Sequence, residues 1–134
     1  MINITRLNHS AIASNARVEA MKHFYEDILG VTTVPRDIPE KLDKLIPGFW
    51  MQFPNGQVHV IACGSDVERQ VMKERAGKEG DPMGPHTAFY VEDIEATEQH
   101  LKDNQVQYWR MEGFIFAADP TGNTVEFQQD PDCA

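Results

Sequence analysis

The chain has 134 residues and a net charge of −9, with 41% hydrophobic and 25% charged residues. Its length and composition are typical of one compact soluble domain with a true core. The negative charge disfavours nucleic acid and anionic membranes as partners, and no apolar stretch is long enough to span a membrane. Two cysteines make no disulfide framework, and the N-terminus lacks the apolar run of a signal peptide. We therefore expect a cytoplasmic protein.

The first half of the sequence predicts a strand, a helix and then three further strands. Apolar residues at helical spacing follow the first strand, and Gly30 can end the helix. Residues 36–47 contain prolines and alternating charges, and they predict a loop with a short helical turn. The segment Pro54-Asn55-Gly56-Gln57 indicates a hairpin between the last two strands. The strands of this half are predicted over residues 7–13, 31–35, 48–53 and 58–63.

The second half repeats this order after a charged connector over residues 64–84, in which 67–75 predicts a short helix. Asp93 is placed as a helix N-cap before residues that return at helical spacing. The segment Asp119-Pro120-Thr121-Gly122-Asn123 predicts a turn before the last strand. The strands of this half are predicted over residues 86–91, 106–110, 114–117 and 124–128.

The two halves therefore look like copies of one βαβββ unit. Asn8-His9-Ser10-Ala11 corresponds to Pro85-His86-Thr87-Ala88, and the turn and strand before His59 correspond to those before Glu126. The turn before Glu126 is one residue longer, which a β-bulge can absorb. A repeat of this kind predicts that residues in matching places share a role.

Four candidate metal ligands occupy such matching places: His9, His59, His86 and Glu126. Apolar residues alternate onto one face of each strand, which puts the candidate ligand on the other face. Taken alone, each of these four residues would usually be interpreted as a polar side chain on the solvent-exposed face of a strand. Together, however, three neutral imidazoles and one carboxylate suit a divalent transition metal, and open positions on that metal can hold substrate oxygens.

Stretches typical of one family run through the chain: Leu7-Asn8-His9-Ser10-Ala11-Ile12, Phe24-Tyr25-Glu26-Asp27-Ile28-Leu29-Gly30, Gly84-Pro85-His86-Thr87-Ala88-Phe89-Tyr90-Val91-Glu92-Asp93-Ile94 and Asp119-Pro120-Thr121-Gly122-Asn123-Thr124-Val125-Glu126-Phe127. They resemble the vicinal oxygen chelate superfamily, the glyoxalase and bleomycin-resistance type of fold. The resemblance implies an α+β fold in which two βαβββ modules form an open, curved mixed β-barrel with helices outside. It also implies a metal in the barrel mouth, with ligands from the first and last strand of each module.

We accordingly predict a single domain over residues 1–134, with a first module over 1–63, the connector over 64–84 and a second module over 85–130. Small members of the family usually pair, so a homodimer is expected. The expected cofactor is one divalent metal ion, which could be zinc, nickel, cobalt, manganese or iron.

The expected activity is metal-dependent proton transfer on a small oxygenated substrate, as in isomerases, epimerases or glyoxalase-like lyases. His59 would be a fourth protein ligand, which favours this chemistry over that of the family's extradiol dioxygenases, which bind iron with two histidines and one glutamate. Glyoxalase I usually has a carboxylate in the place of His59, so Glu126 is the expected catalytic base. Two alternatives stay open: an iron extradiol-type dioxygenase, and a small-molecule-binding or antibiotic-resistance protein without turnover.

Three further residues are predicted to line a substrate pocket: Trp50, Trp109 and Arg110. The tryptophans lie among polar neighbours, although aromatic residues on strands more often belong to the core. Arg110, like Arg36, could pair with a substrate carboxylate, although most arginines are solvated at the surface.

Overall fold

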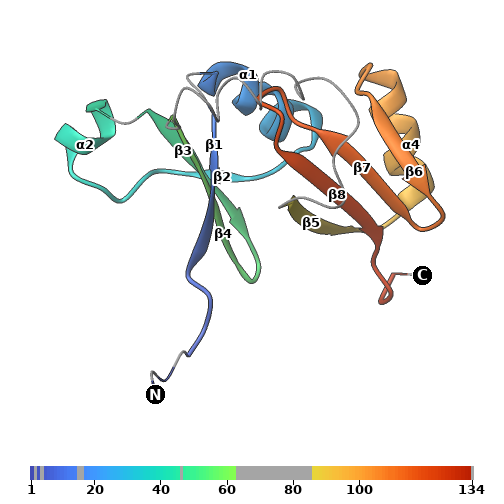
Figure 1. The fold of residues 1–134 in the computed structure, drawn as a ribbon, viewed down its shortest axis with the longest axis horizontal. Coiled ribbons are helices and arrows are strands. Elements are labelled where there is room, and N and C mark those ends of the chain that lie inside the picture. The colour runs from blue at the N-terminus through green and yellow to red at the C-terminus, as the bar shows by residue number, and fades with distance from the viewer. Residues whose placement is uncertain (2, 4, 15–16, 46, 63–85, 134) are drawn as a thin grey trace. The chain divides into compact units, whose positions relative to one another are not determined.

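The structure, a computed structural model, describes the chain except for residues 2, 4, 15–16, 46, 63–85 and 134 and the side chains of residues 42 and 45 (Figure 1). It divides into two compact units, Met1–Cys63 and Gly64–Ala134, and each is described by itself. The predicted connector over 64–84, with its short helix at 67–75, lies outside the described residues.

Unit 1 contains a four-stranded mixed sheet in the order β1-β4-β3-β2. The outer strand β1 is parallel to β4, and the other two pairings are antiparallel. The hairpin is confirmed, because Phe53 pairs with Gly56 and leaves a two-residue turn. Its elements are β1 (His9–Ala13), α1 (Val18–Lys22), the π-helical segment η1 (His23–Ile28), β2 (Thr33–Val34), α2 (Glu40–Leu45), β3 (Gly48–Phe53) and β4 (Gly56–Ile61).

The helix of unit 1 differs from the prediction in its second half. It is α-helical to Lys22 and then π-helical, with the Leu29 amide donating to the Phe24 carbonyl at 2.9 Å. Each residue of a π-helix turns the chain through a smaller angle than in an α-helix. The adjacent aromatic side chains of Phe24 and Tyr25 therefore stay on the buried side together, packed edge to face at 5.1 Å. Gly30, at a φ of +72°, ends the segment as predicted.

Unit 2 repeats the arrangement with the strand order β5-β8-β7-β6, in which β5 is parallel to β8. Its helix begins as predicted, because the Asp93 side chain accepts a hydrogen bond from the Ala96 amide at 2.9 Å. Ile94 and Leu101 of this helix are buried. Its elements are β5 (His86–Val91), α4 (Ile94–Asp103), β6 (Tyr108–Met111), β7 (Phe114–Ala118) and β8 (Thr124–Gln129).

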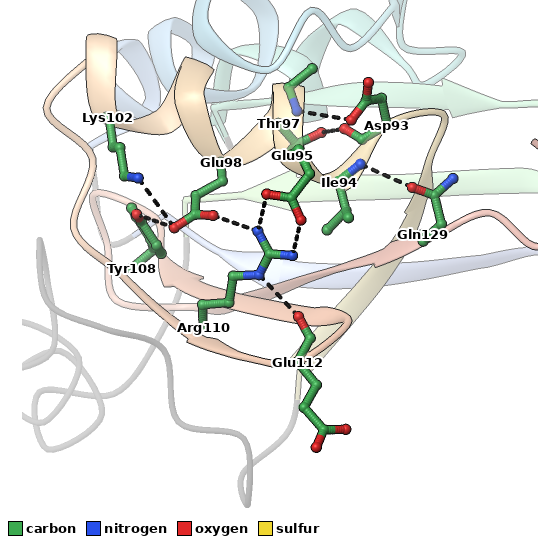
Figure 2. Close-up of polar contacts among 11 residues, drawn as sticks. Asp93, Ile94, Glu95, Thr97, Glu98, Lys102, Tyr108, Arg110, Glu112 and Gln129 are labelled. Atoms are coloured by element: carbon green, nitrogen blue, oxygen red, sulfur yellow. Dashed lines mark hydrogen bonds and ion pairs between the residues drawn. The ribbon is translucent and has the colours of Figure 1, made fainter. Parts of the chain in front are cut away.

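Polar contacts fasten α4 to the sheet of unit 2 (Figure 2). Arg110 of β6 forms ion pairs with Glu95 and Glu98, and the Tyr108 hydroxyl also donates to Glu98. These bonds lower the pKa of Glu98 from 4.5 to about 2, the Tyr108 bond being the largest cause and the Arg110 bond the next. At the N-terminus of the helix, next to Glu95, the Ile94 amide donates to the Gln129 side chain at 3.0 Å.

The turn between β7 and β8 is built around the buried carboxylate of Asp119. Its Oδ1 accepts the backbone amides of Thr121, Gly122 and Asn123, each at 2.9 Å. Its Oδ2 accepts the Asn123 side-chain amide at 2.8 Å, and Gly122 adopts a φ of +103°. The predicted turn is confirmed, and it leads directly into the strand that carries Glu126.

The α+β fold of two βαβββ modules is confirmed. Each module forms its own open, curved sheet, and no strand pairing among the described residues joins the two sheets into a closed barrel. None of the helices in the described part of the chain has the length and apolar composition needed to cross a membrane.

Candidate functional site

The four candidate ligands occupy equivalent places in the strand registers of the two sheets. In unit 1, His9 on β1 pairs with Gln57 on β4, and His59 lies two residues beyond Gln57. In unit 2, His86 on β5 pairs with the residue of β8 that lies two before Glu126. Each unit therefore places two candidate ligands, called donors below because they could donate an electron pair to a metal, on the same face of its sheet. One comes from the first strand and one from the last strand, diagonally across a parallel strand pair.

In unit 1, the two imidazoles form a stack with a tryptophan. The His59 ring lies between the His9 ring, at 3.9 Å and 12° between planes, and the Trp50 ring, at 4.1 Å and 3°. His59 is only 7% exposed. Burial, followed by the charges of His9 and Arg36, lowers the pKa of His59 below its usual value of 6.5. The lowered pKa favours the neutral imidazole, which is the form that binds metals.

Each of these imidazoles has an amide neighbour. His59 Nε2 lies 2.8 Å from Gln57 Oε1, and His9 Nδ1 lies 2.5 Å from Asn8 Oδ1. In each ring one nitrogen is engaged and the other is left for a further partner. This is the usual environment of a metal-binding histidine, whose second nitrogen is held by the protein.

A hollow of about 490 Å³ opens beside this stack, lined by Asn8, His9, Arg36, Asp37, Ile38, Trp50, Gln57, His59 and Ile61. Its size suits a small organic molecule. The guanidinium of Arg36 is paired, since it donates to the Asp43 carboxylate at 2.7 Å and to the Asp43 carbonyl at 2.9 Å. The hollow therefore combines an apolar wall with a cation whose charge is largely balanced.

In unit 2, the two donors are in direct contact. His86 Nε2 lies 2.7 Å from Glu126 Oε2, and the Gln128 amide donates to Glu126 Oε1. Glu126 is only 6% exposed. The Phe116 ring lies edge-on to His86, with the two ring centres 6.2 Å apart. The carboxylate is thus held at both oxygens beside an aromatic ring.

The register shows which aromatic residue accompanies each last-strand donor. His59 pairs across the hairpin with Trp50, and Glu126 pairs across its hairpin with Phe116. Phe116 is therefore the counterpart of Trp50, a relation that sequence reasoning missed. Counting back along the predicted hairpin from Glu126, with the longer turn included, could have found it. Trp109 stacks on Phe116 at 5.5 Å and so lies on the same face as Glu126.

The structure corrects the prediction for Arg110. Side chains alternate along β6, so Arg110 lies on the opposite face from Trp109. That face is covered by α4, and the guanidinium is occupied by Glu95 and Glu98 (Figure 2). Arg110 therefore holds a helix in place, because its guanidinium is paired with two carboxylates of its own unit on the face opposite to Glu126.

A row of side chains crosses the sheet next to Glu126. Met111 pairs with Phe114, Phe114 with Gln128, and Gln128 with Tyr90. Tyr90, Met111 and Phe114 are all exposed. The face that carries Glu126 is therefore apolar as well as acidic.

The structure thus brings the candidate ligands together as two pairs, His9 with His59 and His86 with Glu126. Among the residues that the structure describes, no group of three or more histidine, cysteine or acidic side chains lies close enough to hold a metal ion. The remaining described histidines, His23 and His100, lie on helices and bond to neighbours four residues further along, so they are not part of either pair.

Sequence comparison connects this geometry with a known family. The profile of the glyoxalase/bleomycin resistance protein/dioxygenase superfamily matches residues 6–127. The chain belongs to this superfamily. The match spans all four candidate ligands, so the expected resemblance is confirmed. No curated protein matches the chain at a significant level.

Solved structures share the superfamily fold at low sequence identity. A glyoxalase family protein from Bacillus anthracis is 23% identical, with a TM-score of 0.73 over 97% of this chain and 98% of that protein. Lactoylglutathione lyase from Agrobacterium tumefaciens is 16% identical, with a TM-score of 0.60 over 95% of each chain. A mutant of the fosfomycin resistance protein FosX from Listeria monocytogenes, solved with Mn(II) and 1S,2S-dihydroxypropylphosphonic acid, is 13% identical, with a TM-score of 0.66 over 95% of this chain and 93% of that protein. These proteins share a scaffold and differ in chemistry.

Proposed function

We propose that the chain is a metal-dependent enzyme of the glyoxalase type that transfers a proton on a small oxygenated substrate. In this proposal His9, His59, His86 and Glu126 are the ligands of one divalent ion. The supporting observation is the common register, in which both units offer a first-strand and a last-strand donor at the same offset. Donors at four equivalent positions of a repeat favour a joint role over four unrelated surface residues.

The chemistry of the donors fits a divalent transition metal. The lowered pKa of His59 favours the neutral imidazole that coordinates metals, and Glu126 adds a carboxyl group from a buried position. Such a set accepts zinc, nickel, cobalt, manganese or iron. When bound, the ion would supply Lewis acidity to two neighbouring substrate oxygens and stabilise negative charge that develops on them.

Glu126 is the proposed base. His86 and Gln128 hold its two oxygens, so the carboxylate keeps one orientation. Trp109 and Phe116 lie on the same face, and the carboxylate itself is only 6% exposed. A positioned carboxylate with little water around it is suited to take a proton from a carbon next to a polarised carbonyl.

The substrate class follows from the surroundings of the donors. The hollow beside His59 and the apolar row beside Glu126 favour a small molecule with an apolar part and two neighbouring oxygens. The dihydroxypropylphosphonic acid bound with Mn(II) in FosX has neighbouring oxygens of this kind. Trp50 and Trp109 are the proposed aromatic contacts.

The proposal also includes a homodimer in the cytoplasm. The thiol of Cys133 is free and exposed, which suits a reducing compartment. Light scattering of the purified protein would give the oligomeric state directly.

One observation favours a second candidate, an iron extradiol-type dioxygenase. The His59 ring is stacked between two other rings and is only 7% exposed, so in this alternative it lines the site without binding the metal. His9, His86 and Glu126 would then remain, and two histidines with one carboxylate are the ligand set of many non-haem iron oxygenases.

Metal analysis combined with oxygen uptake tests the proposal. We expect one equivalent of nickel, zinc, cobalt or manganese per chain, and no oxygen consumption with candidate substrates. One equivalent of iron with substrate-dependent oxygen uptake would support the dioxygenase instead. A metal-free protein that binds small molecules tightly would support a binding or resistance protein without turnover.

Proton transfer is tested by deuterium incorporation from D₂O into a panel of 2-hydroxycarbonyl compounds, followed by NMR. Glu126→Gln should lower the exchange rate by about 10²- to 10⁴-fold, the usual contribution of a general base, while retaining part of the metal. Glu112→Gln, which alters an exposed glutamate of the same unit, is the control. Unchanged exchange in Glu126→Gln would remove Glu126 from the role of base.

A further inference from the structure

We propose that Gln52 and Gln57 set the tautomer of His59, holding the proton on Nε2 and leaving Nδ1 as the nitrogen with a free electron pair. The two glutamines are positioning residues. The tautomer itself is a property of the metal-free protein. Its consequence, that His59 meets the ion through Nδ1, rests on the proposed function.

The argument begins at two backbone carbonyls, which can only accept hydrogen bonds. The side-chain nitrogen of Gln52 lies 2.8 Å from the Phe53 carbonyl oxygen and 3.3 Å from the Gly56 carbonyl oxygen. Both partners are acceptors, so the end of the Gln52 amide that lies against them must be the NH₂ group. The oxygen of Gln52 is therefore directed away from the turn.

The orientation of the Gln52 amide determines that of the Gln57 amide. Gln52 and Gln57 are directly opposite each other on β3 and β4, and Gln57 Nε2 donates to Gln52 Oε1 at 2.8 Å. Reversing the Gln57 amide would set its oxygen against the Gln52 oxygen. Reversing both would set the Gln52 oxygen against two carbonyl oxygens. Only one arrangement satisfies every group.

His59 is the end of this chain of bonds. Its Nε2 lies 2.8 Å from Gln57 Oε1, which is an acceptor in the arrangement above, so Nε2 must carry the proton. Nδ1 has no hydrogen-bond partner among the described residues. The ring is also clamped between those of His9 and Trp50, which opposes a rotation that would exchange its nitrogens.

His9 provides an internal contrast. Its Nδ1 lies beside Asn8 Oδ1, but no described group holds the Asn8 amide in one orientation. No comparable series of hydrogen bonds among the described residues therefore determines which nitrogen of His9 carries the proton. Two neighbouring imidazoles of one sheet thus differ in how firmly their tautomers are held.

Long-range ¹H–¹⁵N NMR of the metal-free protein tests the tautomer. The wild type should show His59 with a protonated Nε2 and an unprotonated Nδ1, identified by the loss of its signals in His59→Gln. Gln57→Leu should give a mixture of tautomers, and Gln57→Glu, which keeps an acceptor, should retain the wild-type pattern. A protonated Nδ1 in the wild type, or an unchanged pattern in Gln57→Leu, would overturn the proposal.

Gln52→Leu provides a second variant that does not touch the imidazole. It releases the Gln57 amide, so the His59 signals should move towards those of Gln57→Leu while the fold is retained. Gln99→Leu, on α4, is the matched control and should leave the His59 signals unchanged. A wild-type pattern in Gln52→Leu would show that Gln57 alone, and not the pair, holds the tautomer, which contradicts the proposal.

Zn²⁺ titration against a chromophoric chelator tests the consequence for the metal. Gln57→Leu should weaken Zn²⁺ binding by about 10- to 100-fold, as outer-shell changes do, and Gln57→Glu should bind within a few-fold of wild type. The two failures are distinguishable. A wild type with the expected NMR pattern that binds no metal would refute the proposed function and leave the tautomer standing, whereas tight Zn²⁺ binding with a protonated Nδ1 would refute only the tautomer.

Discussion

The two units share one scaffold but carry different donor pairs. Both place their donors across a parallel strand pair with the same offset. Unit 1 offers two imidazoles, one of them buried in a stack with Trp50, whereas unit 2 offers an imidazole in contact with the Glu126 carboxylate. The duplicated sheet thus determines where a donor lies, while the residue type at that position determines whether the donor is an imidazole or a carboxylate.

The faces beside the donors also differ. The register makes Gly48 of unit 1 the counterpart of Phe114 in unit 2. A Cβ at Gly48 would lie 3.2 Å from a guanidinium nitrogen of Arg36, so the missing side chain leaves room for that guanidinium. Unit 1 therefore has a hollow with an arginine where unit 2 has an exposed ring.

The turns before the last strands differ in how they are held. The two-residue turn of unit 1, Pro54-Asn55, is closed by the backbone pairing of Phe53 with Gly56. The longer turn of unit 2 depends on the Asp119 carboxylate. An inserted residue leaves backbone amides without strand partners, and a buried acceptor then satisfies them.

The largest expected effect is on metal affinity. His9→Ala and His86→Ala each remove the first-strand donor of one unit. Each should weaken Zn²⁺ binding by more than about 100-fold, beyond the range of outer-shell substitutions. Competition with a chromophoric chelator measures the affinity. His23→Ala, a helix histidine paired with Asp27, should bind as wild type. Loss of binding in the unit 2 variant alone would limit the metal to one pair and refute the four-ligand proposal.

The second prediction concerns the turn of unit 2. Asp119→Ala removes the acceptor of three backbone amides, two buried and one half-buried, and should lower the free energy of unfolding by about 4 kcal/mol. Chemical denaturation measures the loss. In unit 1, Asn55→Ala alters an exposed turn residue and should change stability by no more than about 0.5 kcal/mol. Equal effects of the two substitutions would contradict the difference between the turns.

The third prediction concerns the close approach of strands in unit 1. In Gly48→Ala the new Cβ would lie 2.1 Å from the Val60 carbonyl oxygen, so the backbone must shift. We expect a loss of about 2 kcal/mol in the free energy of unfolding. Gly113→Ala in unit 2 is the matched control, because a Cβ there meets no atom within 4 Å. A stable Gly48→Ala variant would show that β3 and β4 can separate without cost.

The smallest expected effect is the acid sensitivity of unit 2. The pKa of Glu98 is lowered to about 2 in the folded chain, so its bonds stabilise the fold above pH 4.5, its ordinary value, and lose effect as the pH falls towards 2. The melting temperature of the wild type should therefore drop more steeply between pH 5 and pH 2 than that of Glu98→Gln. The melting temperature of Glu112→Gln should change with pH as that of the wild type does. If the melting temperature of Glu98→Gln also followed the wild type, the role given to Glu98 would be contradicted.

Much of the fold could be predicted because patterns of residues close together in the sequence indicate its strands, turns and helix ends. Period-two alternation located the strands, Pro54-Asn55 indicated the hairpin, and Asp93 marked the start of α4. The repeat placed His59 and Glu126 in matching positions before any register was known. These signals depend on residues close in sequence, for which spacing alone is informative.

Other features depended on partners distant in sequence. The hairpin registers are needed to recognise Phe116 as the counterpart of Trp50. The pairing of Arg110 with Glu95 and Glu98 also depends on how α4 packs on β6, which residue spacing does not reveal. The π-helical turn at Phe24 likewise follows from packing, since its apolar spacing is also that of an α-helix.

The βαβββ repeat and the four candidate ligand positions could be predicted without any coordinates, because alternation and repetition need no knowledge of distant contacts. The way in which each candidate is held became visible in the fold: His59 lies between two rings and beside Gln57, and Glu126 lies between His86 and Gln128. The physical reason is that stacking and hydrogen bonding require defined distances between side chains, and strand pairing and register set those distances.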